Sequence, residues 1–146
     1  MNDEDEVSII EEIRKYIATC PYLKDGKIGV DFLENEETAY SIEPIPINPT
    51  VVSDIDDGEL KQFAFVFASR ESYGSETVQN MLNTKFYEKF SKWIRINNNN
   101  EVFPDIPGIE SIECTSTAYA YQTGIDTARY QIQLRIIYLS LIHISE

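Results

Sequence analysis

The segment from Asp126 to Tyr138, which alternates strictly from Tyr130 to Ile136, constrains the fold of this chain more than any other segment. Apolar and polar side chains alternate without a break through its YQIQLRI portion. A period of two residues predicts a β-strand with one buried face and one open face. The open face would carry Gln131, Gln133 and Arg135, which can form hydrogen bonds to a partner but include no nucleophile and no acid–base pair. The segment therefore favours a surface for assembly over a reaction centre.

A second segment, Lys61 to Ser69, predicts a strand that is covered on both faces. One face is formed by Phe63, Phe65 and Phe67, and the other by Ala64, Val66 and Ala68. Because both faces are apolar, both need a covering layer. The large face suits a layer of helices. The small face suits something packed close, either another part of the chain or a neighbouring subunit.

Two amphipathic helices are predicted, at residues 2–19 and 75–96. Their apolar stripes are Val7, Ile10, Ile13 and Ile17 in the first and Val78, Met81, Leu82, Phe86, Phe90, Trp93 and Ile94 in the second. The acidic start of the first helix suits the positive end of the helix dipole better than it indicates a docking patch. Pro21 ends this helix, and Ser75 is the expected N-cap of the second. Core packing is the expected role of both stripes.

Further strands are predicted at residues 27–33, 38–42 and 109–121, the last forming an antiparallel hairpin with the strand at 126–138. The element order is then α-β-β-β-α-β-β. The fold class is mixed α/β of the α+β type, a small, mostly antiparallel sheet with two helices on one face. A chain of 146 residues fits one domain, residues 1–138. Residues 139–146, LSLIHISE, resemble a translated sequencing-adapter fragment, and we treat them as a tail of doubtful origin.

The segment from Pro44 to Gly58 predicts either a sheet edge or a stiff arm. Its three prolines hold the chain extended and cannot donate to a sheet ladder. Its apolar residues are Ile45, Ile47, Val51 and Val52. An exposed apolar arm is typical of an interaction site, so these residues are candidates for a subunit interface. The acidic residues near Gly58 do not fit a calcium loop, because Ser53 and Ile55 would take two ligand positions.

The composition limits the chemistry that the chain can perform. A formal net charge of −13 and a pI of about 4.4 disfavour binding to phosphates or anionic lipid. The acidic start is unlike a signal peptide, and no apolar run approaches the ~20 residues of a membrane span. Cys20 and Cys114 are expected to be reduced thiols, and the only histidine is His143. No catalytic, metal or cofactor site is therefore predicted, and a small metal-dependent enzyme using the acidic loop is the alternative.

Three charged residues near strand ends stand out: Arg70, Glu71 and Arg129. Both arginines have aromatic neighbours in sequence, Tyr73 and Tyr130. One interpretation is an ion pair or cation–π contact within the chain. The other is an ion pair between subunits, since arginine is favoured at interfaces. Both interpretations stay open, and these residues join Arg135 as interface candidates.

Four motifs together resemble a known protein family. They are YSIEP at 40–44, KQFAFVFASRESYG at 61–74, FYEKFSKW at 86–93 and DTARYQIQLRIIY at 126–138. The chain, from its first helix to Tyr138, is similar to tail terminator proteins of long-tailed bacteriophages and prophages of Gram-positive hosts. Such proteins are often labelled minor capsid or tail completion proteins. The second and fourth motifs are the most specific.

This resemblance implies a structural role in the virion. It implies a lambda-type tail terminator fold whose subunits form a homo-oligomeric ring, expected to be a hexamer. The ring would cap the tail tube protein at full length and join the tail to the head–tail connector or stopper protein. DNA would pass through without specific binding, and no membrane would take part. The protein would be made in the host cytoplasm and end in the neck of the virion. Another neck or tube component, or the cap of a phage-derived contractile particle, is the alternative within this class.

Overall fold

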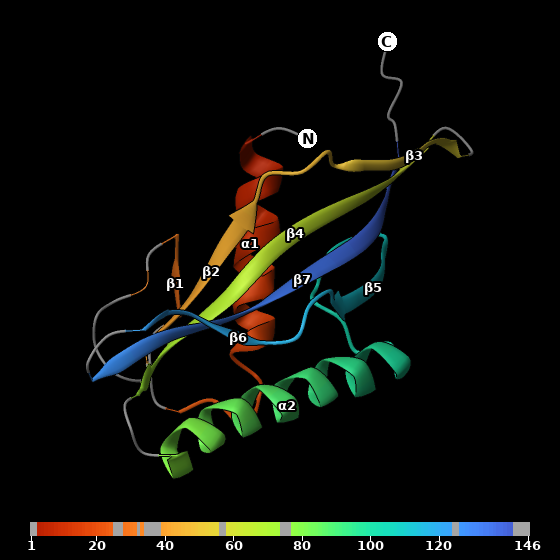
Figure 1. The fold of residues 1–146 in the computed structure, drawn as a ribbon. Helices are drawn as coiled ribbons and strands as arrows, with labels where there is room; N and C mark the ends of the chain where they lie inside the picture. Colours follow the sequence, from red (N-terminus) through yellow and green to blue (C-terminus); the bar gives the residue numbers. More distant parts are fainter. Residues whose placement is uncertain are drawn as a thin grey trace.

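The computed structural model describes residues 3–24, 28–31, 33, 39–55, 58–73, 77–123 and 126–141 (Figure 1). The two helices and seven strands are α1 (Asp3–Ile17), β1 (Ile28–Val30), β2 (Tyr40–Ile45), β3 (Thr50–Ile55), β4 (Gly58–Ser72), α2 (Thr77–Asn99), β5 (Ile109–Cys114), β6 (Tyr119–Thr123) and β7 (Thr127–Leu141). The expected N-cap Ser75 and the histidine His143 lie outside the described residues.

One sheet of seven strands organises the molecule. Its path runs β1-β2-β4-β7-β5, with β3 added to β4 and β6 added to β7. The long strands β4 and β7 pair antiparallel along their whole length, from Gly58 opposite Leu141 to Ser72 opposite Thr127. Among the described strands, only β1 and β2 pair in parallel. The predicted fold class, a mostly antiparallel sheet with two helices, is confirmed.

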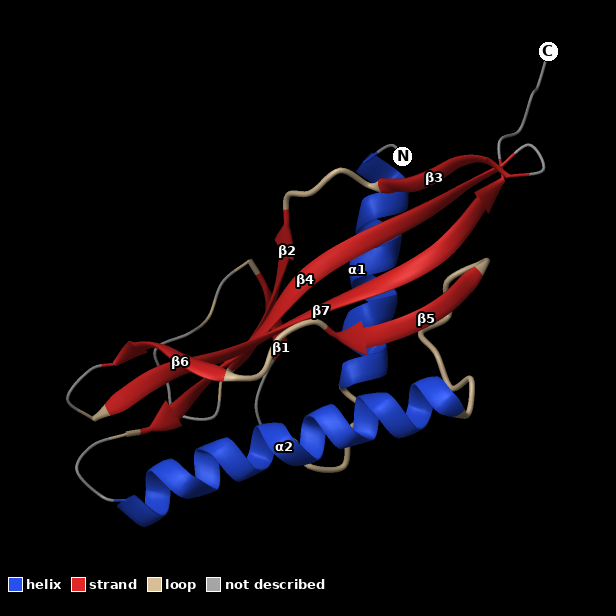
Figure 2. Cartoon of the chain, turned by 45° about the vertical axis from the view of Figure 1, so that its right-hand side comes forward, coloured by secondary structure: helices blue, strands red, loops and turns tan. Residues whose placement is uncertain are grey.

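Both helices cover the same face of this sheet, and the main core lies between the helices and the sheet (Figure 2). The predicted large face of β4 is buried there: Phe67 is fully buried and stacks between Tyr40 of β2 and Phe90 of α2, with ring centroids 5.6 and 4.8 Å away. The alternating apolar residues of β7 join this core. They are Tyr130, Ile132, Leu134, Ile136 and Tyr138. The predicted buried face of β7 and the predicted burial of the large face of β4 are therefore confirmed.

The observed order, α-β-β-β-β-α-β-β-β, has two strands more than the predicted order. Residues 50–55, within the segment predicted to be either a sheet edge or a stiff arm, pair with β4 as the strand β3. The predicted strand at 109–121 is two strands, because a serine interrupts the ladder. The Gln133 amide donates to the Ser116 hydroxyl oxygen at 3.0 Å instead of to a backbone carbonyl, so β5 and β6 pair with different parts of β7.

The helix α2 is rotated relative to the predicted apolar stripe at its start. Met81 and Leu82, expected in the core, are 65% and 54% exposed. Asn83 and Tyr87 are buried instead, and the Tyr87 hydroxyl lies 2.6 Å from the Ser69 hydroxyl of β4. A buried tyrosine usually requires such a polar partner. The predicted apolar stripe was wrong here because it was chosen by hydrophobicity alone. It left out Tyr87, which is buried because its hydroxyl pairs with Ser69.

The small face of β4 is packed partly by the chain itself. Val66 and Ala68 are buried with Leu33, Ala39 and Ile45 in a second, smaller cluster. The small side chains on this face of β4 predicted a closely packed neighbour, and this cluster provides one. The neighbour is a segment of the same chain, although the rest of this face holds polar groups described below.

The last strand continues beyond the predicted domain end at Tyr138. Leu139 pairs with Leu60 of β4, and its amide donates to the Gly108 carbonyl at 2.8 Å. Gly108 has a φ of +77°, and a Cβ there would lie 2.2 Å from the Leu139 carbonyl oxygen. Only glycine fits so close an approach with this backbone conformation. Residues 139–141 are thus integrated into the sheet.

Candidate functional site

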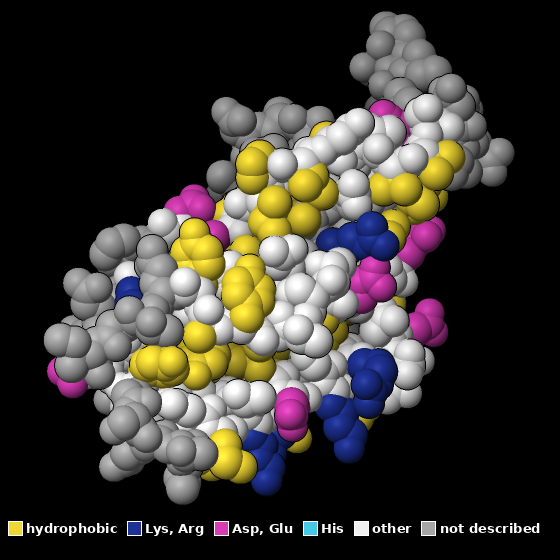
Figure 3. All heavy atoms as spheres, viewed as in Figure 1, with side chains coloured by type: hydrophobic (Ala, Val, Ile, Leu, Met, Phe, Trp, Pro, Cys, Tyr) yellow, Lys and Arg dark blue, Asp and Glu magenta, His cyan; other side chains and the backbone are white. Residues whose placement is uncertain are grey.

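The face of the sheet opposite the helices, which we call the open face, carries the candidate site; it is turned toward the reader in Figures 1 and 3. Its centre is an ion pair between Arg129 of β7 and Glu43 of β2. Arg129 donates to both carboxylate oxygens, at 2.9 and 2.7 Å, and its Nε donates to Gln131 at 2.8 Å. A two-point pair of this kind has fixed geometry. The pair therefore clamps two strands that are not neighbours in the sheet.

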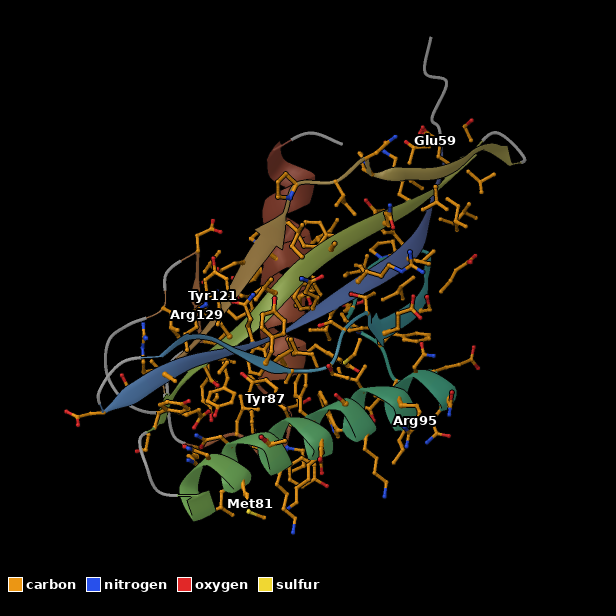
Figure 4. All side chains as sticks on the ribbon, in the orientation of Figure 1. Glu59, Met81, Tyr87, Arg95, Tyr121 and Arg129 are labelled. Carbon is orange, nitrogen blue, oxygen red and sulfur yellow. The ribbon has the colours of Figure 1, made fainter. Side chains whose placement is uncertain are left out.

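Small side chains make this clamp possible. The strand β4 lies between β2 and β7, and its Ala68 stands opposite Gln131 on one side and Ser41 on the other. An alanine leaves room for the Arg129 side chain to cross β4 and reach Glu43. The Arg129 guanidinium also lies 5.7 Å from the ring centroid of Tyr121, where a cation–π contact forms (Figure 4).

The clamp changes the titration of its carboxylate. Hydrogen bonds from Arg129 lower the pKa of Glu43 below its ordinary value of 4.5, and the Ser41 hydroxyl, 2.9 Å away, acts in the same direction. Partial burial opposes both and raises the pKa. Glu43 is consequently ionised at neutral pH and holds Arg129 in place.

Further polar groups extend this network along the open face. The Tyr119 hydroxyl of β6 accepts a hydrogen bond from Gln131 at 2.7 Å. Toward the other end of β7, Arg135 donates to Glu113 of β5 at 2.7 Å and to Gln62 of β4 at 3.2 Å. The alternating polar residues of β7 thus bind neighbouring strands and hold their side chains in fixed positions.

The interface candidates predicted from sequence fall into two groups. Arg129 and Arg135 both have partners within the chain, as the intramolecular interpretation required. Glu71 is buried, with its carboxylate 3.6 Å from the Lys24 ammonium. Arg70 is half-buried and stands opposite Arg129 in register. Whether any of these residues also meets a second subunit stays a prediction.

The arm is defined here as β3 and the start of β4, residues 50–55 and 58–61; in the second group, Val51 and Val52 lie in the arm, and Ile45 and Ile47 precede it. The arm projects beyond the layer of helices together with the end of β7 (Figures 1 and 2). Val51 and Val52 are 43% and 44% exposed, and Ile47 just before the arm is 40% exposed. Ile45, in contrast, is half-buried in the smaller cluster. Three of the four apolar candidates are therefore accessible.

Exposed aromatic residues are the part of the site that the sequence analysis missed. Tyr121 is 58% exposed and Tyr119 is 37% exposed, both on β6. Figure 3 shows hydrophobic side chains spread over this face between polar ones. A signal was available in the sequence, since Tyr119 and Tyr121 alternate with Ala120 as strand residues do. Glu43 was missed because its partner lies 86 residues away in sequence.

Burial raises the pKa of both cysteine thiols. Cys20 and Cys114 are free thiols, and burial raises the pKa of Cys114 to about 11. A thiol with so high a pKa is not a nucleophile at neutral pH. No cluster of three or more histidine, cysteine, aspartate or glutamate side chains suited to a metal occurs within the described ranges. Neither described helix is long and apolar enough to cross a membrane.

The chain matches no protein-family model and no curated protein sequence.

Proposed function

We propose that this chain is a structural subunit of a phage tail, a tail terminator that assembles into a ring on the end of the tail tube. The ring would join the tail to the head connector. The proposal assigns no catalytic step to the protein. It rests on the four motifs that resemble the terminator family, and one structural observation carries it furthest.

That observation is the arm. It places an apolar edge strand, with Val51 and Val52 exposed, beyond the body of the domain. Exposed edge strands present unpaired backbone groups and readily pair or pack with another chain. An apolar arm therefore supports association with further subunits.

The open face supports the same proposal in a different way. Its polar groups are held by the clamp between Glu43 and Arg129, while Tyr119 and Tyr121 remain accessible. Tyrosine and arginine are enriched where protein surfaces bind each other. Because these groups are fixed before binding, little conformational entropy is lost on association. A rigid surface of this kind suits a subunit that meets the same neighbours in every particle.

Electron microscopy of the purified protein, with and without tail tubes, tests the proposal. We expect ring-shaped particles alone and a cap at one end of each tube. Duplex DNA should bind the isolated protein weakly, because the net charge of −13 repels phosphate. A monomer that leaves tubes uncapped would contradict the proposal, as would tight, salt-sensitive binding of duplex DNA.

A further inference from the structure

The outer face of α2, turned away from the sheet, has features that core packing does not explain (Figure 4). Met81 and Leu82 are exposed there, although large apolar side chains are usually buried. The same face carries a concentration of positive charge. Its cations are Lys85, Lys89, Lys92 and Arg95, four of the chain's 12 lysines and arginines.

These cations are not neutralised within the described part of the chain. None of the four lies within ion-pair distance of a described carboxylate; the five ion pairs observed use other lysines and arginines. Lys89 lies over the Tyr22 ring, 5.6 Å from its centroid. Glu88 is the single acidic residue in the sequence of α2. The helix is thus a basic surface on a protein that is otherwise strongly acidic.

A groove accompanies this basic face. A hollow of about 740 Å³ lies between α2 and the β5–β6 region, with Ile112 and Cys114 among its lining residues and Lys92 and Arg95 on the side of the helix. A second hollow of about 560 Å³ lies beside Met81 and Lys85. The two share Thr84 and Glu88, so together they follow the helix along most of its length.

The arm has the complementary properties. Its apolar part is exposed at Val51 and Val52. Its sequence is acidic and contains no cation before Lys61; the acidic residues are Asp54 and Glu59, with Asp56 and Asp57 between them outside the described residues. On α2, exposed apolar side chains lie beside positive charges. On the arm, exposed apolar side chains lie beside negative charges. Complementary patterns of this kind select partners and fix their register.

The arm cannot reach the α2 of its own chain. In Figures 1 and 2 the arm lies at one end of the molecule and α2 at the other, with the sheet between them. Glu59 and Met81, labelled in Figure 4, mark these two ends. A contact between the two surfaces must therefore join two molecules.

We propose that the arm of one copy docks on the outer face of α2 of the next copy. The six residues of β3 span roughly 20 Å, and the 23 residues of α2 span roughly 35 Å, so the strand fits along the helix. Val51 and Val52 meet the side of α2 that carries Met81 and Leu82, and the negative charge that Asp54 and Glu59 give the arm is attracted to the cations of α2. Because the two surfaces differ, each copy can use its arm on one neighbour and its α2 on another. Such a repeated contact gives a closed ring or an open filament. This inference deepens the proposed function and rests on it.

Two charge-reversal variants test the contact. The helix variant carries Lys85→Glu and Arg95→Glu, and the arm variant carries Asp54→Lys and Glu59→Lys. Each reversal changes the charge by two, so the helix variant moves from −13 to −17 and the arm variant from −13 to −9. Each variant alone places like charges at every contact. We expect self-association to fall at least about tenfold in both, measured by sedimentation velocity. Circular dichroism checks that both remain folded.

An equimolar mixture of the two variants should restore assembly. In an alternating arrangement, each acidic helix meets a basic arm and each basic helix meets an acidic arm. Net charge alone predicts a different result, because the arm variant carries less total charge and would associate more strongly than the wild type. Loss of assembly in the arm variant, followed by rescue in the mixture, is therefore specific to this contact.

The outcomes separate this inference from the proposed function. If the wild type forms rings and either variant alone also forms them, the docking of the arm on α2 is wrong, but the proposed ring is still supported. Folded variants that fail to assemble when mixed overturn it as well. Duplex DNA that binds the wild type and not the helix variant would make α2 a phosphate-binding surface instead. A wild type that stays monomeric and does not cap tails refutes both.

Discussion

The covered face and the open face of the sheet share the same strands, yet their side chains are held by different forces. On the covered face, Phe67 and its neighbours are excluded from water by two helices. On the open face, the clamp between Arg129 and Glu43 fixes polar groups that stay in reach of solvent. Hydrophobic burial supplies most of the stability of a fold, whereas a partly exposed ion pair supplies little. The comparison indicates that the covered face maintains the fold and that the open face and the arm are available for partners.

Removing a core aromatic side chain should give the largest effect. Phe67→Ala should destabilise the fold by about 3–5 kcal/mol, because it loses apolar burial and leaves a cavity between Tyr40 and Phe90. Urea unfolding followed by circular dichroism measures this loss. Gln133→Ala, on the open face of the neighbouring strand, is the control and should change the stability by less than about 0.5 kcal/mol. Equal losses for the two variants would show that the faces do not differ.

A charge introduced on the small face should give the next effect. Val66→Arg places a cation among Leu33, Ala39 and Ala68, and we expect a loss of about 3 kcal/mol. The same substitution at Val52, which is exposed, should change stability by less than about 0.5 kcal/mol. Thermal unfolding compares the pair. A Val66→Arg protein with wild-type stability would mean that this part of the face is open to water.

Breaking the clamp should cost less than either core change. Arg129→Met leaves Glu43 without its main partner, and we expect a loss of about 1–2 kcal/mol, since both groups keep some exposure. Combining it with Glu43→Gln in a double-mutant cycle isolates the pair. The double variant should lose less than the sum of the two single losses. Additive losses would mean that the two residues contribute independently.

The clamp should also depend on pH in a defined direction. The pKa of Glu43 is lowered in the folded state, so its contribution is present above the ordinary value of 4.5 and is lost as pH falls through the lower, folded pKa. Glu43→Gln should therefore destabilise the protein by about 1 kcal/mol at pH 7, and the difference from wild type should shrink below about pH 4.5. Unfolding curves at a series of pH values measure it. A difference that is constant from pH 7 to pH 3 would rule out the ionised clamp.

The sequence predicted the covered face well and the arm only in part. Alternation in β4 and β7 gave the buried set correctly, because a period of two residues is a local property that tertiary contacts reinforce. The prolines before β3 indicated an edge, and residues 50–55 do form an edge strand. Their pairing with β4 was not predicted, although the Asp57-Gly58 dipeptide where the two strands join is typical of tight hairpins; the acidic residues there were weighed only against a calcium loop.

The long-range contacts of the open face were beyond sequence reasoning. Nothing local couples Glu43 to Arg129, and the crossing depends on Ala68 being small in the strand between them. The exposed start of α2 was missed for a related reason. Met81 and Leu82 fit a helical stripe by spacing, yet the helix is rotated so that Tyr87 can meet Ser69. Pairing between distant polar groups decided the outcome in both places.

The smallest expected effect on stability belongs to the arm. Val51→Thr with Val52→Thr keeps the β-branched shape and the strand propensity, so the stability of the isolated domain should change by less than about 0.5 kcal/mol. Self-association should nevertheless weaken, because both side chains lose apolar contact with the next copy. Val30→Thr, at another exposed strand position, is the matched control and should leave association unchanged. If the Val51→Thr/Val52→Thr variant associates as strongly as the Val30→Thr control, the arm is not part of the interface.

The mass of the wild-type protein in solution tests the central claim most directly. Each chain has a mass of 16.8 kDa. Sedimentation equilibrium over a range of concentrations should give one species at three or more times that mass that does not grow with concentration, the behaviour of a closed ring. A single species of 16.8 kDa at every concentration, in the presence and absence of tail tubes, would contradict the claim that this protein is built to assemble.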